Sequence, residues 1–130
     1  MAKFIKQALA GERLEIFGDG SQTRDFIHIA DLVRAIRRSA EQAGVGGETF
    51  QIATAQETTV TEMTDALIAV MQAEGLNPPQ VFNGASRTGD VARNYSDTTK
   101  AAAQLGWRAE VGLRDDLRRT LRYFLNQKDQ

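Results

Sequence analysis

Residues 18–28 read Gly-Asp-Gly-Ser-Gln-Thr-Arg-Asp-Phe-Ile-His, and this stretch decides the fold more than any other part of the chain. Apolar residues precede it at positions 14, 16 and 17, and further apolar residues follow at positions 26, 27 and 29. Apolar segments on both sides of a glycine-rich turn are typical of a β-hairpin. The sequence therefore predicts a hairpin around Gly18 and Gly20, with Arg24 at its mouth. A guanidinium in that place can meet a phosphate as a bidentate donor.

The composition is typical of a globular protein whose partners are neither nucleic acids nor membranes. The 130 residues carry a net charge of -1, which gives no electrostatic reason to expect either partner. No stretch has the length and apolarity of a membrane span or a signal peptide. The absence of cysteine and the single histidine leave the chain without the parts of common metal sites. We predict one domain over residues 1–130, located in the cytoplasm and without a metal.

Helical patterns follow the predicted hairpin. Asp31 precedes apolar residues at helical spacing and is predicted to be the N-cap of that helix, while Thr59 and Glu62 form the capping box of the next helix. The sequence predicts an α+β fold with four main helices, the β-hairpin and two further short strands, near Phe50 and Val81. Three arginines at positions 34, 37 and 38 are interpreted as a solvated helix face, because no aromatic residue is interleaved with them.

The sequence lacks the common catalytic signatures. Gly18 and Gly20 begin like a dinucleotide-binding fingerprint, but Thr23 stands where the third glycine belongs, and a strand is expected to follow instead of a helix. A Walker A lysine, a nucleophile elbow and a Tyr-x-x-x-Lys pair are absent. The single histidine, His28, lies among apolar residues and is interpreted as a structural residue rather than a general base. We therefore predict no catalytic residue in this sequence.

A second group of chemically useful residues is the segment Arg87-Thr88-Gly89-Asp90. Arginine offers a planar donor fork to a phosphate, and glycine lets the backbone approach a ligand. Aspartate can accept hydrogen bonds from two vicinal hydroxyls, such as those of a ribose. The same residue types also occur in surface turns that are closed by an internal ion pair. Taken alone, the segment leaves both interpretations open.

In their order and spacing, these motifs resemble the C-terminal portion of the NAD-dependent epimerase/dehydratase family. This family comprises extended short-chain dehydrogenases that act on nucleotide sugars, and the resemblance is nearest to its UDP-glucose 4-epimerase-like members. It covers nearly the whole chain and implies the substrate-binding part of such an enzyme without its Rossmann half. The matching segments are residues 3–5, 8–11, 16–28, 31–33 with Ala35, 50–52, 58–62, 87–90, 97–101 and 105–107.

The resemblance assigns roles to three residues of this chain. Arg24 and Arg87 would clamp the diphosphate of a UDP- or dTDP-sugar from two sides, and Asp90 would hold the ribose hydroxyls. One departure from the family lies at residues 53–55, where the usual Gly-x-Gly is replaced by Ala-Thr-Ala. Because alanine adopts a positive φ only at a cost, the sequence leaves the path of that loop open.

The resemblance also implies what this sequence does not contain. The family's NAD site and its catalytic Tyr-x-x-x-Lys lie upstream of the matching region, so NAD would belong to the complete enzyme and no cofactor to this chain alone. The predicted function is a nucleotide-sugar-binding part that is catalytically incomplete by itself. Two alternatives stay open: an interaction or scaffold module, and a half that complements a separate NAD-binding chain. The strand at Phe50 would present an unpaired edge, where we predict a homodimer contact or that separate chain.

Overall fold

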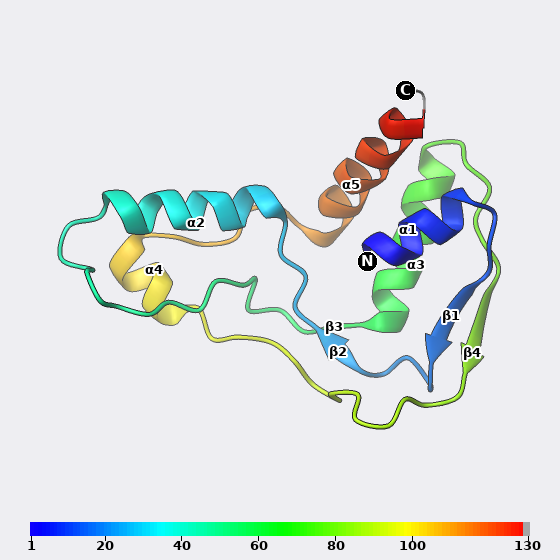
Figure 1. Ribbon diagram of the computed structural model, residues 1–130, viewed down its shortest axis with the longest axis horizontal. Helices are drawn as coiled ribbons and strands as arrows, with labels where there is room; N and C mark the ends of the chain where they lie inside the picture. The colour runs from blue at the N-terminus through cyan, green and yellow to red at the C-terminus, as the bar shows by residue number, and fades with distance from the viewer. Residues whose placement is uncertain (129–130) are drawn as a thin grey trace.

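The computed structural model describes residues 1–128, which form five helices and four short strands (Figure 1). The predicted α+β class is confirmed, and the capping box of Thr59 and Glu62 is present at the start of the third helix. The elements, in chain order, are α1 (Ala2–Leu9), β1 (Leu14–Phe17), β2 (Thr23–Arg24), α2 (Ile29–Glu41), β3 (Thr58–Thr59), α3 (Val60–Ala73), β4 (Val81–Gly84), α4 (Thr99–Leu105) and α5 (Leu113–Lys128).

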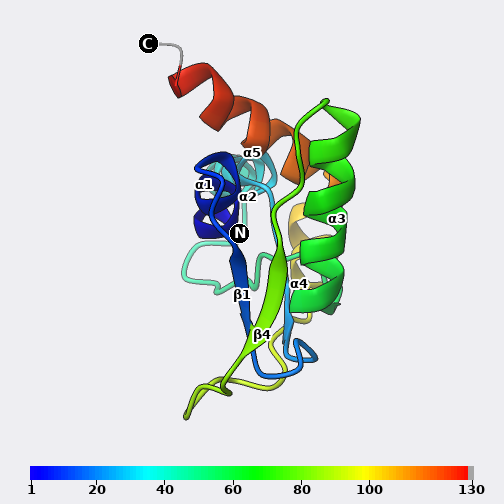
Figure 2. The same cartoon turned by 90° about the vertical axis from the view of Figure 1, so that its right-hand side faces the viewer.

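The strands pair in two separate sheets of two strands each. β1 and β4 run parallel, with Leu14 opposite Val81 and Phe17 opposite Gly84, and Figure 2 shows them side by side. β2 pairs with β3 in antiparallel fashion through two residues of each strand. Because β1 and β4 point the same way, the loops that follow them leave from the same edge of their sheet. This edge carries both motifs that the sequence singled out.

The predicted β-hairpin around Gly18 and Gly20 does not form. After the turn, the carbonyl of Gly20 accepts from the N–H of Thr61 at 3.2 Å, and that of Gln22 accepts from the N–H of Val60 at 3.0 Å. These bonds draw the chain to the start of α3 instead of back along β1. The partner of β1 comes from more than 60 residues further on, and a local pattern cannot reveal such a crossover pairing.

The predicted strand near Phe50 is also wrong. Residues 49–53 follow an irregular path, with Phe50 and Ile52 packed against the buried residues between α2 and α4. An extended segment counts as a strand only when it finds a hydrogen-bonded neighbour, and among residues 1–128 none lies beside this one. The contact predicted at this segment, with a second copy or a separate chain, stays a prediction, whereas the strand near Val81 is confirmed as β4.

Two apolar cores hold the elements together. The first lies between α1, β1, α3 and α5 and includes Leu14, Leu67 and Leu121, all fully buried; Met63 and Met71 pack in it as ordinary core residues. The second lies between α2 and α4 and is built around the fully buried Trp107.

Within residues 1–128, no helix combines the length and the hydropathy needed to cross a membrane.

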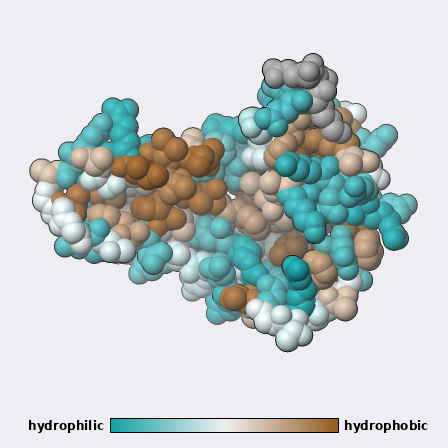
Figure 3. Space-filling model, viewed as in Figure 1, coloured by the Kyte–Doolittle hydropathy of each residue, from teal (hydrophilic) through white to brown (hydrophobic). Residues whose placement is uncertain are grey.

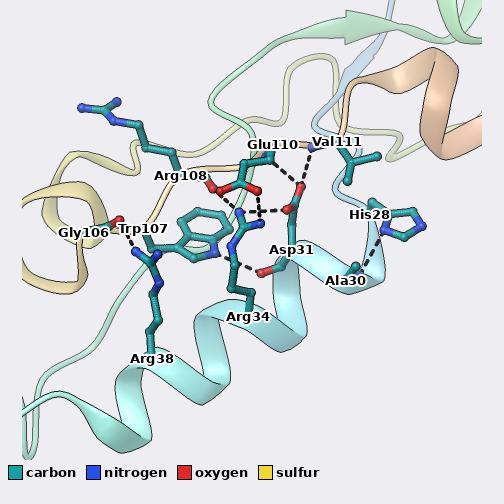
Figure 4. Close-up of polar contacts among 10 residues, drawn as sticks. All are labelled: His28, Ala30, Asp31, Arg34, Arg38, Gly106, Trp107, Arg108, Glu110 and Val111. Atoms are coloured by element: carbon teal, nitrogen blue, oxygen red, sulfur yellow. Dashed lines mark hydrogen bonds and ion pairs between the residues drawn. The ribbon is translucent and has the colours of Figure 1, made fainter.

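A buried aspartate connects the second core to the segment that leads into α5. Asp31 is fully buried, and its Oδ2 accepts from the backbone N–H groups of Glu110 at 3.0 Å and Val111 at 2.9 Å (Figure 4). Its Oδ1 pairs with Arg34 at 2.9 Å, and its carbonyl accepts from the indole of Trp107 at 3.0 Å. We call these contacts the Asp31 anchor. They fix residues 107–111 on α2.

The prediction that Asp31 is the N-cap is wrong. The N-cap of α2 is His28, whose Nδ1 accepts from the N–H of Ala30 at 3.1 Å. Asp31 lies inside the first turn, and its side chain turns away from its own helix end because two N–H groups about 80 residues later need an acceptor. The structural interpretation of His28 agrees with this capping position.

Candidate functional site

The candidate site is a shallow hollow at the carboxyl ends of the parallel strands β1 and β4. It has a volume of about 200 Å³, and its lining includes Phe17, Ser21, Ser86, Arg87 and Asp90. Larger hollows of about 490 and 460 Å³ lie beside α2 and between α2 and α5. Neither of those is lined by Arg87 or Asp90. The smaller hollow is the candidate because ligands of α/β proteins bind outside the carboxyl ends of parallel strands.

Two glycines shape the turn on one side of the hollow. Gly18 and Gly20 have φ angles of 68° and 78°, a region that other residues adopt only at a cost. A Cβ on Gly20 would lie 2.2 Å from Oγ1 of Thr61, so the turn approaches α3 too closely for any side chain. Within the turn, Asp19 accepts from the hydroxyl and the N–H of Ser21, at 2.6 and 2.9 Å. These bonds lower the pKa of Asp19.

The guanidinium of Arg24 holds the loop after β4 from the other side. Its Nη2 lies 2.5 Å from Oδ1 of Asp90, and its Nη1 donates to the carbonyls of Thr23 at 2.7 Å and Val91 at 2.6 Å. The structure therefore brings two of the three predicted site residues into contact. Asp90 pairs with Arg24, which lies 66 residues away, and this pairing differs from the internal ion pair that the motif alone also allows.

Arg87 lies with its guanidinium over the ring of Phe17, 4.5 Å from the ring centroid. The stacking leaves the edge of the guanidinium, with its N–H donors, directed away from the ring. Within the part of the chain that the structure describes, Arg87 has neither an ion pair nor a hydrogen bond from its side chain. An uncommitted cation thus stands beside the hollow, while Asp90 and Ser21 line the same space.

Glu57, just before β3, forms a second contact with the loop that carries Asp90. Its carboxylate accepts from Arg93 in a bidentate pair, at 2.7 and 2.6 Å, and its Oε1 also accepts from the hydroxyl of Thr23 at 2.8 Å. The hydrogen bonds from Arg93 and, to a smaller extent, from Thr23 lower the pKa of Glu57 from 4.5 to about 2. Sequence reasoning missed both residues, because nothing local to either one indicates the other.

This pair predicts a specific dependence of stability on pH. Because the pKa of Glu57 is lower in the folded chain than the ordinary 4.5, its contribution to stability is complete above pH 4.5 and is lost as the pH falls towards 2. We expect Glu57→Gln to be less stable than the wild type near pH 7, with a difference that shrinks as the pH falls below 4.5. Urea unfolding of both proteins at about pH 7 and about pH 3 measures this. An equal difference at both pH values would contradict the assignment.

The Ala-Thr-Ala segment at residues 53–55, whose path the sequence left open, keeps a positive φ at one of its alanines. Ala55 has a φ of 60° and is the one residue other than glycine with a positive φ in residues 1–128. Asp25 holds the segment in place, with its two carboxylate oxygens accepting from the N–H of Thr54 at 2.8 Å and of Ala55 at 2.9 Å. The backbone keeps a conformation that suits glycine, and Asp25 offsets part of the cost. Sequence analysis did not select Asp25, although it adjoins Arg24.

The site contains no set of metal ligands. Within residues 1–128, no three carboxylate or histidine side chains gather closely enough to hold a metal ion. The side chains that line the hollow are instead one arginine, two aspartates, two serine hydroxyls, a glutamine amide and an aromatic ring. Their chemistry suits an anionic ligand that also carries hydroxyl groups.

Comparisons with known proteins agree with this description. Residues 1–120 match the family described as GDP-mannose 4,6 dehydratase. The chain is 35% identical to a UDP-glucose 4-epimerase of Mycolicibacterium smegmatis over 130 residues, which cover 98% of this chain and 39% of that protein. It is also 36% identical to a UDP-glucose 4-epimerase of Caenorhabditis elegans over 124 residues, which cover 86% of this chain and 34% of that protein.

Solved structures show the same relationship. A UDP-glucose 4-epimerase of Thermotoga maritima, determined with UDP-glucose, has a TM-score of 0.85 at 35% identity, with 97% of this chain and 39% of that one covered. A UDP-glucuronic acid 4-epimerase of Bacillus cereus, in complex with UDP-glucuronic acid and NAD, has a TM-score of 0.86 at 28% identity. The match covers 98% of this chain and 40% of that one. The chain thus spans about two fifths of the length of these relatives. It belongs to the GDP-mannose 4,6-dehydratase family, within the NAD-dependent epimerases and dehydratases, and corresponds to the C-terminal portion of its members.

Proposed function

We propose that this chain binds a nucleoside diphosphate sugar in the hollow at the ends of β1 and β4. The observation that carries the proposal is the uncommitted guanidinium of Arg87, stacked on Phe17 beside the carboxylate of Asp90. A diphosphate is the anion that a planar donor fork suits best, and vicinal hydroxyls suit a carboxylate. Similar structures that contain UDP-glucose or UDP-glucuronic acid support the ligand class.

The three proposed ligand residues differ in how free they are to act. Arg87 brings its whole donor edge to the diphosphate. Arg24 has used three of its five N–H donors on Thr23, Val91 and Asp90, so two remain for a phosphate oxygen. Asp90 has committed Oδ1 to Arg24, which leaves Oδ2 to accept from the ribose hydroxyls. Arg24 would thus act both as a direct contact and as the support of Asp90.

The proposed role stops at binding, and the chain alone would not epimerise or dehydrate a sugar. These reactions need a nicotinamide to take and return a hydride, and a base to remove the hydroxyl proton. The sequence holds neither a dinucleotide-binding fingerprint nor a Tyr-x-x-x-Lys pair. The finer substrate, UDP-sugar or dTDP-sugar, is part of the proposal and follows the relatives, which include a dTDP-glucose 4,6-dehydratase.

Replacing Arg87 tests the proposal directly. We expect Arg87→Ala to weaken the binding of UDP-glucose about 10- to 100-fold, because a charge-assisted hydrogen bond contributes about 1.5–3 kcal/mol. Isothermal calorimetry on the wild type and the variant measures this loss. Arg37→Ala is the matched control, since Arg37 is an exposed arginine on α2 whose partner is Glu41 on the same helix. The proposal fails if the wild type gives no heat at millimolar ligand, or if Arg87→Ala binds as tightly as the control.

One observation favours a second candidate function, a half that works together with an NAD-binding chain. On α2, Ile29, Val33 and Ile36 are 64%, 55% and 61% exposed, and Figure 3 shows a continuous apolar patch over this helix. Such a patch is typical of a surface that packs against another protein. Epimerase activity on mixing with an NAD-binding chain of the family would support this function. A monomeric mass in that mixture and no activity would contradict it.

A further inference from the structure

We propose that the ion pair between Glu57 and Arg93 is a positioning device for the ligand site, which holds the loop of residues 87–93 in its binding conformation. Neither side chain lines the hollow, so both would act through Asp90 and Arg87. The inference rests on the proposed function, because it concerns the affinity of the same site. It adds Glu57 and Arg93, which lie outside the sequence segments that carry the family resemblance.

The ion pair between Glu57 and Arg93 is bidentate. The carboxylate of Glu57 faces the fork of Arg93 with two parallel contacts, from Nε at 2.7 Å and from Nη2 at 2.6 Å. The side chain of Glu57 is 25% exposed, whereas that of Arg93 is 68% exposed and also lies 5.6 Å from the ring centroid of Tyr95. A bidentate pair restricts rotation as well as distance, which a single contact does not.

Glu57 adds a further connection between β2 and the loop that follows β4. Its Oε1 accepts from the hydroxyl of Thr23 in β2 in addition to the guanidinium of Arg93. The N–H of Thr23 donates to the carbonyl of Ala92 at 2.9 Å, one residue before Arg93. Together with the contacts of Arg24 to Asp90 and Val91, four consecutive residues of the loop are attached to β2 or to Glu57.

The loop needs such attachment because it has no regular structure of its own. Residues 85–98 form neither helix nor strand, and Arg87 and Asp90 are connected only by a turn in which the N–H of Asp90 donates to the carbonyl of Arg87 at 3.2 Å. A loop that is ordered before the ligand arrives does not lose conformational entropy on binding. The Glu57–Arg93 pair closes the loop three residues after Asp90, and so reduces that cost.

The test is a double-mutant cycle read by two measurements. Glu57→Gln, Arg93→Gln and the double variant are titrated with UDP, and hydrogen exchange of residues 87–93 is measured without ligand. We expect each single variant to bind UDP about 3- to 10-fold more weakly than the wild type, with faster exchange in the loop. The double variant should be no weaker than the single ones, because the pair acts as a unit. The charge reversal Glu57→Arg with Arg93→Glu should restore part of the affinity, which a general loss of stability would not explain.

Arg122→Gln is the matched control. Arg122 forms the same kind of bidentate pair with Glu74, at 3.0 and 2.9 Å, between α5 and the end of α3. Its loss should leave the affinity for UDP unchanged. Unchanged affinity in Glu57→Gln and Arg93→Gln, with a wild type that binds, would overturn the inference while leaving the proposed function intact. If the wild type binds no UDP, the proposed function fails, and with it the role in affinity, whereas unchanged exchange in the loop would refute the attachment itself.

Discussion

Asp31→Ala is expected to lower the free energy of unfolding by about 3–5 kcal/mol, a large fraction of the total stability of a domain of this size. The carboxylate is fully buried, and its removal leaves the N–H groups of Glu110 and Val111 without an acceptor and Arg34 without its partner at 2.9 Å. Partly buried donors that lose their acceptor keep a large part of the cost of desolvation. Urea unfolding followed by circular dichroism measures the loss.

Two further variants separate the Asp31 anchor from a simple loss of charge. Asp31→Asn keeps the shape of the side chain and one acceptor oxygen. It should therefore lower the free energy of unfolding less than Asp31→Ala does, and the protein should still fold. Glu41→Ala removes an exposed carboxylate from the same helix, where it pairs with Arg37 at 2.8 Å, and should have no measurable effect. If Asp31→Ala were as stable as Glu41→Ala, the anchor would contribute nothing to the fold.

Gly20→Ala is expected to cost about 2–4 kcal/mol and to abolish tight binding of UDP-glucose. The new Cβ would lie 2.2 Å from Oγ1 of Thr61 and 3.0 Å from Cγ2 of Ile16, and the residue would have to keep a φ of 78°. Overpacking and a positive φ each cost about 1–3 kcal/mol. Relief of the clash would move the turn of residues 18–21, which lines the hollow.

Gly11→Ala isolates the contribution of the clash. Gly11 has a φ of 74° but open space around the position of a Cβ, so it carries the conformational cost alone. It should therefore lose less stability than Gly20→Ala and should bind UDP-glucose normally. Adding Thr61→Ala to Gly20→Ala should recover part of the stability, since the nearest clashing atom is then gone. Equal losses of stability in Gly11→Ala and Gly20→Ala would show that the close approach of Gly20 to α3 adds nothing to the cost of the substitution.

The helices could largely be predicted from the sequence, whereas the pairing of the strands could not. Helical periodicity, the capping box at Thr59 and the left-handed Gly106 act within a few residues, so a local pattern contains their causes. The partner of β1 is separated from it by α2 and α3, and only the whole chain decides that pairing. The predictions of the hairpin and of the strand near Phe50 were wrong for this reason. Both depended on pairing partners that a local pattern does not reveal.

The candidate site shows the same division. The residue types made Arg24, Arg87 and Asp90 candidates, and the family resemblance assigned their roles. The structure places Arg87 and Asp90 in one hollow, with Arg24 in contact with Asp90. Their contacts could not be foreseen, because Arg24 meets Asp90 across 66 residues and Glu57 meets Arg93 across 36. The family resemblance supplied the expectation that these segments act together. The parallel alignment of β1 and β4 is what brings these segments to the same edge of the sheet.

Because of that parallel alignment, binding of the proposed ligand would also report on folding. The two loops of the site come from strands that meet only after α2 and α3 have been laid down between them, so local contacts alone cannot assemble the site. A ligand that bridges both loops would stabilise the whole first core by mass action, in proportion to its concentration relative to Kd. A short peptide that carries residues 18–28 alone should therefore bind no nucleotide sugar, however well its sequence matches the motif.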